Sequence, residues 1–330
     1  MKPPHGNRPS GSGRPPSDRG PYQGPGGSPQ RPQGPAGSGP RRDNGPRADA
    51  PRGQAPRPAG GQPYQPRPNQ AQPQRQGAPR PQHHDAPRGT PDAPKGTVWL
   101  YGHHAIAAAL ANRSRRLRRL LLTEEAEATL TQHFPQPWPL SAERVDRARL
   151  DHLLGRDIVH QGAALLADPL APPSLQSVLE RPGTIVVLDQ VTDPRNVGAI
   201  LRAAAAFGAA AVITQDRNAP DETGGLAKAA SGALETMPLL RAVNIARTLI
   251  ALKAANIWCV GLDAAGPPLS GPALSDRRVA LVLGAEGEGL RRLTRETCDE
   301  IAGLTIKGAV ESLNVASAAA VALYELTRRP

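Results

Sequence analysis

Strand-like and helical patterns alternate along the C-terminal half of this 330-residue chain. Patterns typical of strands occupy 185–189, 211–214, 257–262, 279–283 and 301–306, and helical patterns occupy 197–207, 243–255, 290–298 and 313–327. The strand segments are mostly apolar, as in IVVL and VALVL, instead of alternating between apolar and polar positions. Strands of this kind are buried on both faces of a sheet. The pattern therefore predicts an α/β fold with a mostly parallel sheet that helices cover on both faces.

A smaller α/β pattern precedes this region. A helix is expected over 103–111, a strand or the end of a helix over 117–122, a second helix over 141–153 and an apolar strand over 163–166. Prolines and polar residues then predict a linker that contains a short helix. The expected organisation is a small N-terminal domain (97–168), a linker (169–183) and a larger domain (184–330).

Residues 1–96 differ in composition from the rest of the chain. They hold 24 of the 38 prolines and 17 of the 34 glycines, and their 15 basic and 5 acidic side chains give +10 of the total charge of +11. Such a segment cannot bury enough apolar surface to offset the entropy of ordering, so we expect a long disordered N-terminal tail. Two roles fit such a tail: an electrostatic tether for RNA, or a solubilising linker without a specific partner.

Composition argues against several classes of protein and site. Two cysteines, Cys259 and Cys298, are too few for a disulfide scaffold and do not suggest a zinc site. The histidine pairs 83–84 and 103–104 have no acidic residue or cysteine at ligand spacing, so no metal is expected. The sequence contains no apolar run of ~18 residues, the length needed to span a membrane. The N-terminal MKPPHGN lacks the apolar core of a secretory signal. We therefore expect a protein of the reducing cytoplasm with no membrane partner.

Polar side chains gather where the predicted strands end. Three loops carry them, with Asn196 and Arg202 in or after the first, Glu286 and Glu288 in the second, and Ser312 and Asn314 in the third. In an open parallel sheet, ligands bind at the carboxyl ends of the strands. Structural explanations exist for each: the asparagines and the serine would cap helices, and the arginine would pair with a carboxylate or extend into solvent. Their shared position at one edge of one sheet nevertheless predicts a functional site.

The second of these loops reads GAEGEG over 284–289. Its glycines allow the close backbone approach that nucleotide-phosphate sites use. Glu286 and Glu288 would repel a pyrophosphate, however, and the loop lacks the lysine that holds a triphosphate. It therefore suits a ligand without phosphates that carries a cationic or hydrogen-bond-donating group, and S-adenosylmethionine has both a sulfonium and an adenine amine. The structural alternative is a glycine-rich turn with solvated glutamates.

Five arginines lie within seven residues of the small predicted domain. They are Arg113, Arg115, Arg116, Arg118 and Arg119. Because no acidic residue lies among them, the cluster predicts contacts with RNA phosphates. The alternative is a solvated, highly charged surface.

At the three loops the sequence resembles the SpoU/TrmH class of RNA ribose 2′-O-methyltransferases, in the SPOUT superfamily. The signature motifs of that class are similar to LDQVTDPRNVGAILRAAAAFG, LVLGAEGEGL and SLNVASAAAVALYE in this chain. Flanking segments such as RRLTRETCD resemble in particular the branch that methylates a guanosine of 23S rRNA, in the peptidyl-transferase region. YGHHAI and HQGAAL resemble the small L30e-like substrate-binding domain of that branch. The resemblance covers about residues 97–330.

The resemblance implies a trefoil-knotted catalytic domain that acts as a homodimer, with the site completed across the interface. It also implies S-adenosylmethionine as methyl donor, no metal, and RNA as partner. The residues expected around the reacting ribose hydroxyl are Arg202, Asn196, Glu286, Ser312 and Asn314, with Arg202 acting on the hydroxyl. Those whose backbone would hold the donor are Gly284, Leu304 and Leu313.

The chain departs from the class in one motif. Many members have Ile-Pro-Met before the glycine of the third motif, whereas this chain reads Leu-Thr-Ile-Lys over 304–307, which predicts a looser cradle for the donor's adenine. Two other functions fit the same residues: methylation of a tRNA ribose, and a non-catalytic RNA-binding module that keeps the fold. The five residues at the expected hydroxyl site argue against the module, because RNA binding alone does not require all of them.

Overall fold

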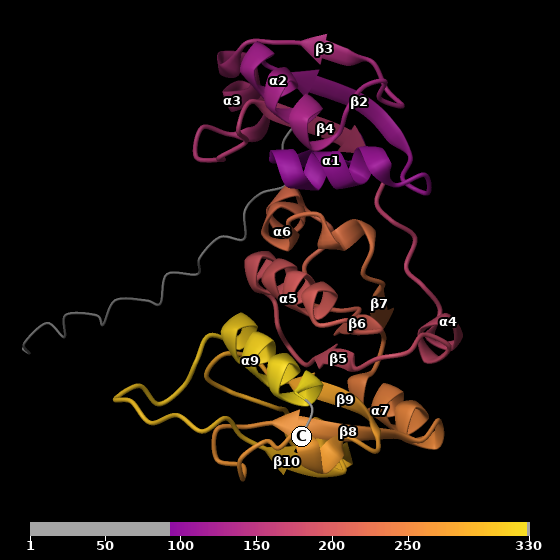
Figure 1. The fold of residues 1–330 in the computed structure, drawn as a ribbon, viewed down its shortest axis with the longest axis vertical. Coiled ribbons are helices and arrows are strands. Elements are labelled where there is room, and N and C mark those ends of the chain that lie inside the picture. The colour runs from indigo at the N-terminus through magenta and orange to yellow at the C-terminus, as the bar shows by residue number, and fades with distance from the viewer. Residues whose placement is uncertain (1–92, 329–330) are drawn as a thin grey trace, which may run out of the picture. The chain divides into compact units, whose positions relative to one another are not determined.

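A computed structural model describes residues 93–328, so the expected tail (1–96) lies outside the described residues except for its last four. The described residues form a mixed α/β structure with two sheets (Figure 1). One sheet has four strands in the order β1-β4-β2-β3, and the other has six in the order β10-β8-β9-β5-β6-β7. No helix in this part of the chain is long and apolar enough to cross a membrane.

The six-stranded sheet is parallel throughout, as the apolar strand patterns predict. Its strands are β5 (Ile185–Leu188), β6 (Ala211–Gln215), β7 (Leu239–Ala242), β8 (Ile257–Leu262), β9 (Arg278–Leu283) and β10 (Glu300–Ala302). The helices associated with it are α5 (Pro194–Ala206), α6 (Gly224–Ala230), α7 (Ile245–Ala254), α8 (Arg292–Thr297) and α9 (Val315–Thr327), with short 3₁₀ turns η1 (Ala233–Glu235) and η2 (Pro272–Leu274).

Alternate residues of each strand enter two different hydrophobic cores. Val186 and Leu188 of β5 pack in a core with side chains of α5 and α9, whereas Ile185 and Val187 pack in a core with side chains of α7. Successive side chains of a strand point to opposite faces, so the two cores lie on the two faces of the sheet. The expectation that helices cover both faces is confirmed.

The four-stranded sheet combines antiparallel and parallel pairs. Strand β4 (Ala163–Ala167) runs antiparallel to β1 (Val98–Tyr101) and β2 (Leu117–Leu122), and β3 (Ala142–Arg144) pairs parallel with β2. The accompanying helices are α1 (His103–Ala111), α2 (Glu124–His133) and α3 (Arg147–Leu154), and α4 (Leu175–Leu179) lies in the segment that leads to β5.

The helix expected over 141–153 is wrong in its first part. Residues 142–144 form the edge strand β3, and α3 begins only after Asp146, whose carboxylate accepts a hydrogen bond from the Arg149 amide at 2.8 Å. An aspartate that bonds the amide three residues on is a typical N-cap and starts a helix at that point. Buried Leu150 and half-buried Leu153 pack together with Val145 in one cluster, although Val145 lies before the helix.

Candidate functional site

Three of the expected site residues form one hydrogen-bonded cluster. Asn196 Nδ2 donates to Glu286 Oε1 at 3.0 Å, and Asn314 Nδ2 donates to the same oxygen at 2.7 Å and to Asn196 Oδ1 at 3.0 Å. The three side chains come from the first turn of α5, the loop after β9 and the start of α9. The convergence follows from the parallel sheet, because the carboxyl ends of its strands meet at one edge.

The capping interactions explain why these side chains are available. Asp193 caps α5 by accepting a hydrogen bond from the Arg195 amide at 2.8 Å, so the explanation of Asn196 as a helix cap is wrong. Asn314 does cap α9, because its Oδ1 accepts from the Ala316 amide at 2.9 Å. Its amide nitrogen remains free to reach Glu286, so a single side chain both starts the helix and joins the cluster.

The loop that carries Glu286 closes on itself. The Ala285 amide donates to the Gly289 carbonyl at 3.1 Å, and the Gly289 amide donates back to the Ala285 carbonyl at 3.0 Å. A Cβ atom at Gly284 would overlap the backbone of Gly289, and Gly287 has a φ of 85°, a value that favours glycine. The glycines of this loop therefore allow a tight turn that holds Glu286 beside the two asparagines.

A cavity of about 530 Å³ lies beside this cluster. Its lining includes Gly284, Glu286, Leu304, Ser312, Leu313 and Asn314, all of which were expected at the donor or hydroxyl site. Asp263 and Glu288 also line it, and no lysine or arginine does. The cavity is within the size of small-molecule sites, roughly 300–1,000 Å³. Because only carboxylates bring charge to it, the cavity suits a cationic ligand better than a phosphate.

Asp263 is a lining residue that the sequence predictions missed. It directly follows β8, and its carboxylate pairs with Arg295. The signal for it is its place in the sequence, because Asp263 follows the strand expected over 257–262 and ligands bind at the carboxyl ends of parallel strands.

Arg202 does not join this cluster. It lies exposed on α5, and no hydrogen bond or ion pair connects its side chain to another residue of the described chain. Within the described residues Arg202 therefore does not pair with a carboxylate, and its side chain extends into solvent. Arg202 is six residues beyond Asn196, which places the two side chains on different sides of the helix at 3.6 residues per turn.

Most of the positive charges of the arginine cluster are balanced by acidic side chains, which the local sequence does not suggest. Arg118 makes two hydrogen bonds of 2.8 Å to Asp168, and Arg119 pairs in the same way with Glu143 at 2.9 and 2.8 Å. Arg116 is exposed, with its Nε 3.8 Å from Asp168, and Arg113 is exposed. Compensating acids absent from the local sequence are thus supplied by distant segments.

Arg115 has a different environment from its neighbours. Its side chain is fully buried and forms ion pairs with Glu222 and with Glu235, the latter at 2.5 Å. Burial lowers the pKa of its guanidinium, but the hydrogen bonds and charges of Glu235 and Glu222 outweigh burial and raise that pKa. A buried and paired guanidinium cannot contact a phosphate, which corrects the expectation that Arg115 binds RNA.

Neither cysteine is suited to nucleophilic chemistry. Burial raises the pKa of the Cys259 thiol to about 12 and that of Cys298 to about 11. The thiolate is the reactive form, so both side chains are inert near neutral pH. Among the residues that the structure describes, no group of three or more His, Cys, Asp or Glu side chains could hold a metal ion.

Sequence comparisons identify relatives over both sheets. Residues 183–324 match the SpoU rRNA Methylase family, and residues 99–173 match the RNA 2′-O ribose methyltransferase substrate binding family. The 23S rRNA (guanosine-2′-O-)-methyltransferase RlmB of Bordetella pertussis is 36% identical over 239 residues, which are 71% of this chain and 98% of that protein. The RlmB of Ralstonia nicotianae is 39% identical over 244 residues, 70% of this chain and 95% of that protein.

Solved structures show the same fold. An RNA 2′-O ribose methyltransferase crystal structure aligns with a TM-score of 0.58 at 27% identity, over 70% of this chain and 88% of that one. The SpoU methyltransferase AviRb from Streptomyces viridochromogenes, crystallised with AdoMet, aligns with a TM-score of 0.59 at 23% identity, over 70% of this chain and 89% of that one. With the motif residues converging at one edge of the sheet, these matches establish that the chain belongs to the SpoU rRNA methylase family.

Proposed function

We propose that this protein transfers a methyl group from S-adenosylmethionine to the 2′-hydroxyl of a guanosine ribose in 23S rRNA. The observation that carries the proposal is the cluster of Asn196, Glu286 and Asn314 at the edge of the large cavity. Relatives at 36% and 39% identity are methyltransferases of this specificity. We also propose that the protein acts in the cytoplasm.

The cavity beside the cluster fits the methyl donor. A sulfonium and an amino group would be stabilised by Asp263, Glu286 and Glu288, which are the only charged side chains in its lining. Leu304 and Leu313 supply apolar surface for the adenine, and the closed turn at Gly284 lets the backbone approach it. When bound, the donor supplies a methyl group on a good leaving group, so the protein must supply alignment of the acceptor and removal of a proton.

Arg202 would act on the acceptor. A guanidinium group keeps its proton in proteins and is a poor base, so the role of Arg202 is to polarise the ribose hydroxyl or to hold the adjacent phosphate. Glu286, held by two asparagine amides, and exposed Ser312 at the rim would order the nucleotide around it. In-line placement of a nucleophile in this manner contributes several kcal/mol, on the order of 7 or more in favourable cases.

A homodimer would bring Arg202 to the donor cavity. Helix α9 exposes Val321 and Tyr324, and the loop before it exposes Val310. A second copy would remove these apolar side chains from water, which favours association. We propose that Arg202, exposed on α5 and absent from the cluster of its own chain, completes the site of the second copy.

The two sheets would belong to domains with different functions, RNA binding and methyl transfer. We propose that residues 97–168 form an L30e-like domain that binds RNA, that 169–183 form a linker, and that 184–330 form a trefoil-knotted methyltransferase domain. The family matches over 99–173 and 183–324 support this division. The exposed arginines Arg113, Arg116, Arg118 and Arg119 would contact phosphates, although all except Arg113 already form ion pairs with acids.

The test is methyl transfer by Arg202→Ala with purified protein, labelled donor, and unmodified transcripts of 23S rRNA and of tRNA. We expect the variant to lose at least about 100-fold in rate, while calorimetry shows unchanged affinity for S-adenosylmethionine. Near-normal turnover would refute the role of Arg202. Transfer to tRNA alone would refute the 23S assignment, and absence of donor binding by the wild type would favour the non-catalytic RNA-binding module.

A further inference from the structure

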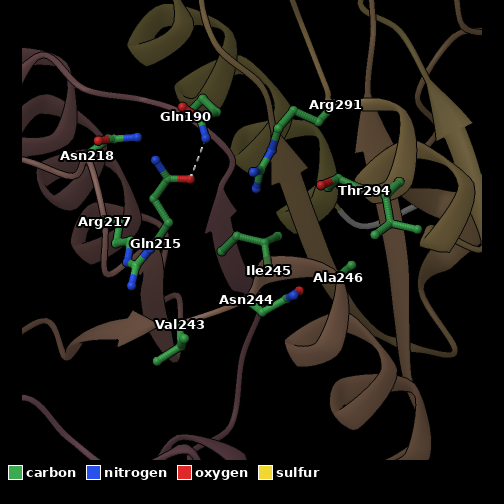
Figure 2. Close-up of a pocket in the computed structure, with 11 residues that line it drawn as sticks. Gln190, Gln215, Arg217, Asn218, Val243, Asn244, Ile245, Ala246, Arg291 and Thr294 are labelled. Atoms are coloured by element: carbon green, nitrogen blue, oxygen red, sulfur yellow. Dashed lines mark hydrogen bonds between the residues drawn. The ribbon is translucent and has the colours of Figure 1, made fainter.

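A second cavity, of about 290 Å³, opens at the carboxyl ends of β5, β6 and β7 (Figure 2). It shares no lining residue with the larger cavity. Residues at the starts of α7 and α8 line it, whereas residues of α9 line the larger one. The two cavities thus lie on opposite faces of the sheet along one edge, and the second is not part of the proposed methyl-transfer site.

A buried amide in this cavity lacks a partner. Gln215, the last residue of β6, is only 5% exposed, and its Oε1 accepts a hydrogen bond from Gln190 Nε2 at 3.0 Å (Figure 2). Its Nε2 has no hydrogen-bond partner among residues 93–328. Exchanging the nitrogen and oxygen of both amides would only leave the Gln215 oxygen unpartnered instead. Because buried polar atoms are almost always satisfied, a ligand with hydrogen-bonding groups is expected here.

The arginines of the cavity differ in their charge balance. Arg291 is fixed by the fully buried carboxylate of Asp189, which accepts from its Nε at 2.7 Å and lies 2.5 Å from its Nη2. This ion pair balances the charge of Arg291 and leaves its half-exposed planar group at the cavity. Arg217 is exposed and forms no ion pair with any residue in the described part of the chain. The cavity therefore has one unbalanced positive charge.

The start of α7 adds to this positive potential. Asn244 caps the ten-residue helix, with its Oδ1 accepting from the Arg247 amide at 3.0 Å, and Ile245 and Ala246 line the cavity with the first turn. The first amides of a helix have no partner within it and attract an anion. Arg217 and this helix start together suit a phosphate.

The remaining features match a nucleobase. Amide side chains of Gln190, Gln215 and Asn218 present donors and acceptors that can read the edge of a base. Unpaired bases in RNA also stack on arginine planes, and the plane of Arg291 is held in place by Asp189. Val243 and Leu293, 86% and 56% exposed, offer apolar surface at the rim. A volume near the lower limit of small-molecule sites leaves room for a single nucleotide.

We propose that this cavity binds one unpaired nucleotide of the RNA substrate, other than the nucleotide that is methylated. The base lies against the three amides and Arg291, and the phosphate lies between Arg217 and the start of α7. The inference rests on the proposed function only in taking RNA as the source of the nucleotide. The same two chain segments contribute to both sites. The segment after β5 carries Gln190 and then Asn196, and the segment after β9 carries Glu286 and then Arg291. A nucleotide anchored here would orient the strand toward the methyl-transfer site.

The test compares full-length protein with three variants for binding to an unmodified 23S rRNA transcript. Arg217→Gln and Gln215→Met alter the cavity, and Arg247→Gln is the control because it removes the same charge from an exposed position of α7 outside the lining. We expect the two cavity variants to raise the RNA Kd about tenfold or more, as for loss of a base or phosphate contact. Arg247→Gln should change it much less. Thermal unfolding and calorimetry with S-adenosylmethionine should be unaltered in Arg217→Gln and Arg247→Gln.

A photo-crosslinking side chain provides a measurement that does not disturb the buried amide. A benzophenone at Val243 should crosslink to the transcript, and one at Ile250, exposed farther along α7 and outside the lining, should not. Equal RNA affinity of Arg217→Gln and Arg247→Gln, without crosslinking at Val243, would overturn the proposal. So would tight binding of free GMP or AMP that Arg217→Gln abolishes without any change in RNA affinity, because the cavity would then serve a free nucleotide. Neither result depends on methyl transfer.

Discussion

Replacing Arg115 by methionine should destabilise the protein strongly, although Arg115 belongs to a cluster with mostly exposed neighbours. Its guanidinium is fully buried and forms ion pairs with Glu222 and Glu235. Its Nη1 also donates a hydrogen bond to the Asp168 carbonyl at 2.9 Å. Both glutamates are almost fully buried, with 10% and 3% of their side chains exposed. Methionine preserves most of the apolar volume and removes all of these bonds.

The magnitude follows from the two carboxylates left without a counter-ion, since each would keep only a neutral hydrogen bond, from Asn112 to Glu235 and from the Leu170 amide to Glu222. Removing one member of a buried ion pair costs about 3–5 kcal/mol, mainly because the remaining charge stays buried. At roughly 2–4 °C per kcal/mol for a domain of this size, the unfolding temperature should fall by about 6–20 °C. Adding Glu222→Gln and Glu235→Gln to Arg115→Met should restore part of the loss, since the buried charges are then removed as well.

Differential scanning calorimetry measures this effect, with Arg118→Met as the matched control. Arg118 bonds Asp168 through two contacts of 2.8 Å, but both side chains are partly exposed. An exposed pair contributes about 0–1 kcal/mol, so the control should lose no more than about 4 °C. Equal losses for Arg115→Met and Arg118→Met would refute the reasoning that burial makes Arg115 structural.

Three further predictions concern the donor loop, the thiols and the N-terminal segment. Gly284→Ala places a Cβ against the backbone of Gly289, so calorimetry should show donor affinity at least about tenfold weaker; unchanged affinity would separate this turn from the donor site. With pKa values raised to about 12 and about 11, Cys259 and Cys298 should react with iodoacetamide at pH 8 far more slowly in the native protein than in urea; equal rates would contradict their burial. Deleting residues 1–96 removes a net charge of +10, so RNA binding should weaken, most at low salt, with donor affinity intact; unchanged RNA affinity would make this segment a linker.

The main features of the larger sheet could be predicted because most of its strands are apolar segments that stand out in the local sequence. Apolar segments such as IVVL and VALVL are buried on both faces, and four of the six strands match predicted segments closely. The strand expected over 301–306 is only partly right, because β10 ends at Ala302. Strand β7 was missed because Leu239–Ala242 is a short edge strand with Arg241 inside it. Helix α6 was also missed, because it begins with Gly224 and Gly225, and two consecutive glycines are typical of a loop. Gly224 instead packs against Tyr101, where a side chain would overlap the ring.

The candidate site was predictable to the extent that strand ends bring residues together. This rule and the family motifs anticipated the grouping of Asn196, Glu286 and Asn314 around one turn. The ion pairs of the arginine cluster could not be predicted in the same way. Arg115 pairs with acids 107 and 120 residues away, and only the docking of α6 and η1 against β1 and α1 brings them near. Nor could local sequence reveal the buried Gln215, because its neighbours in the cavity come from four separate segments.

The most direct test of the proposed function is a map of ribose methylation in cells. Ribosomal RNA and tRNA from a strain lacking this protein would be compared with RNA from the parent strain and from a strain complemented with the wild-type or Arg202→Ala chain. The proposed function predicts that a single guanosine of 23S rRNA loses its 2′-O-methyl group and that only the wild-type chain restores it. An unchanged 23S rRNA, or a loss confined to tRNA, would contradict it.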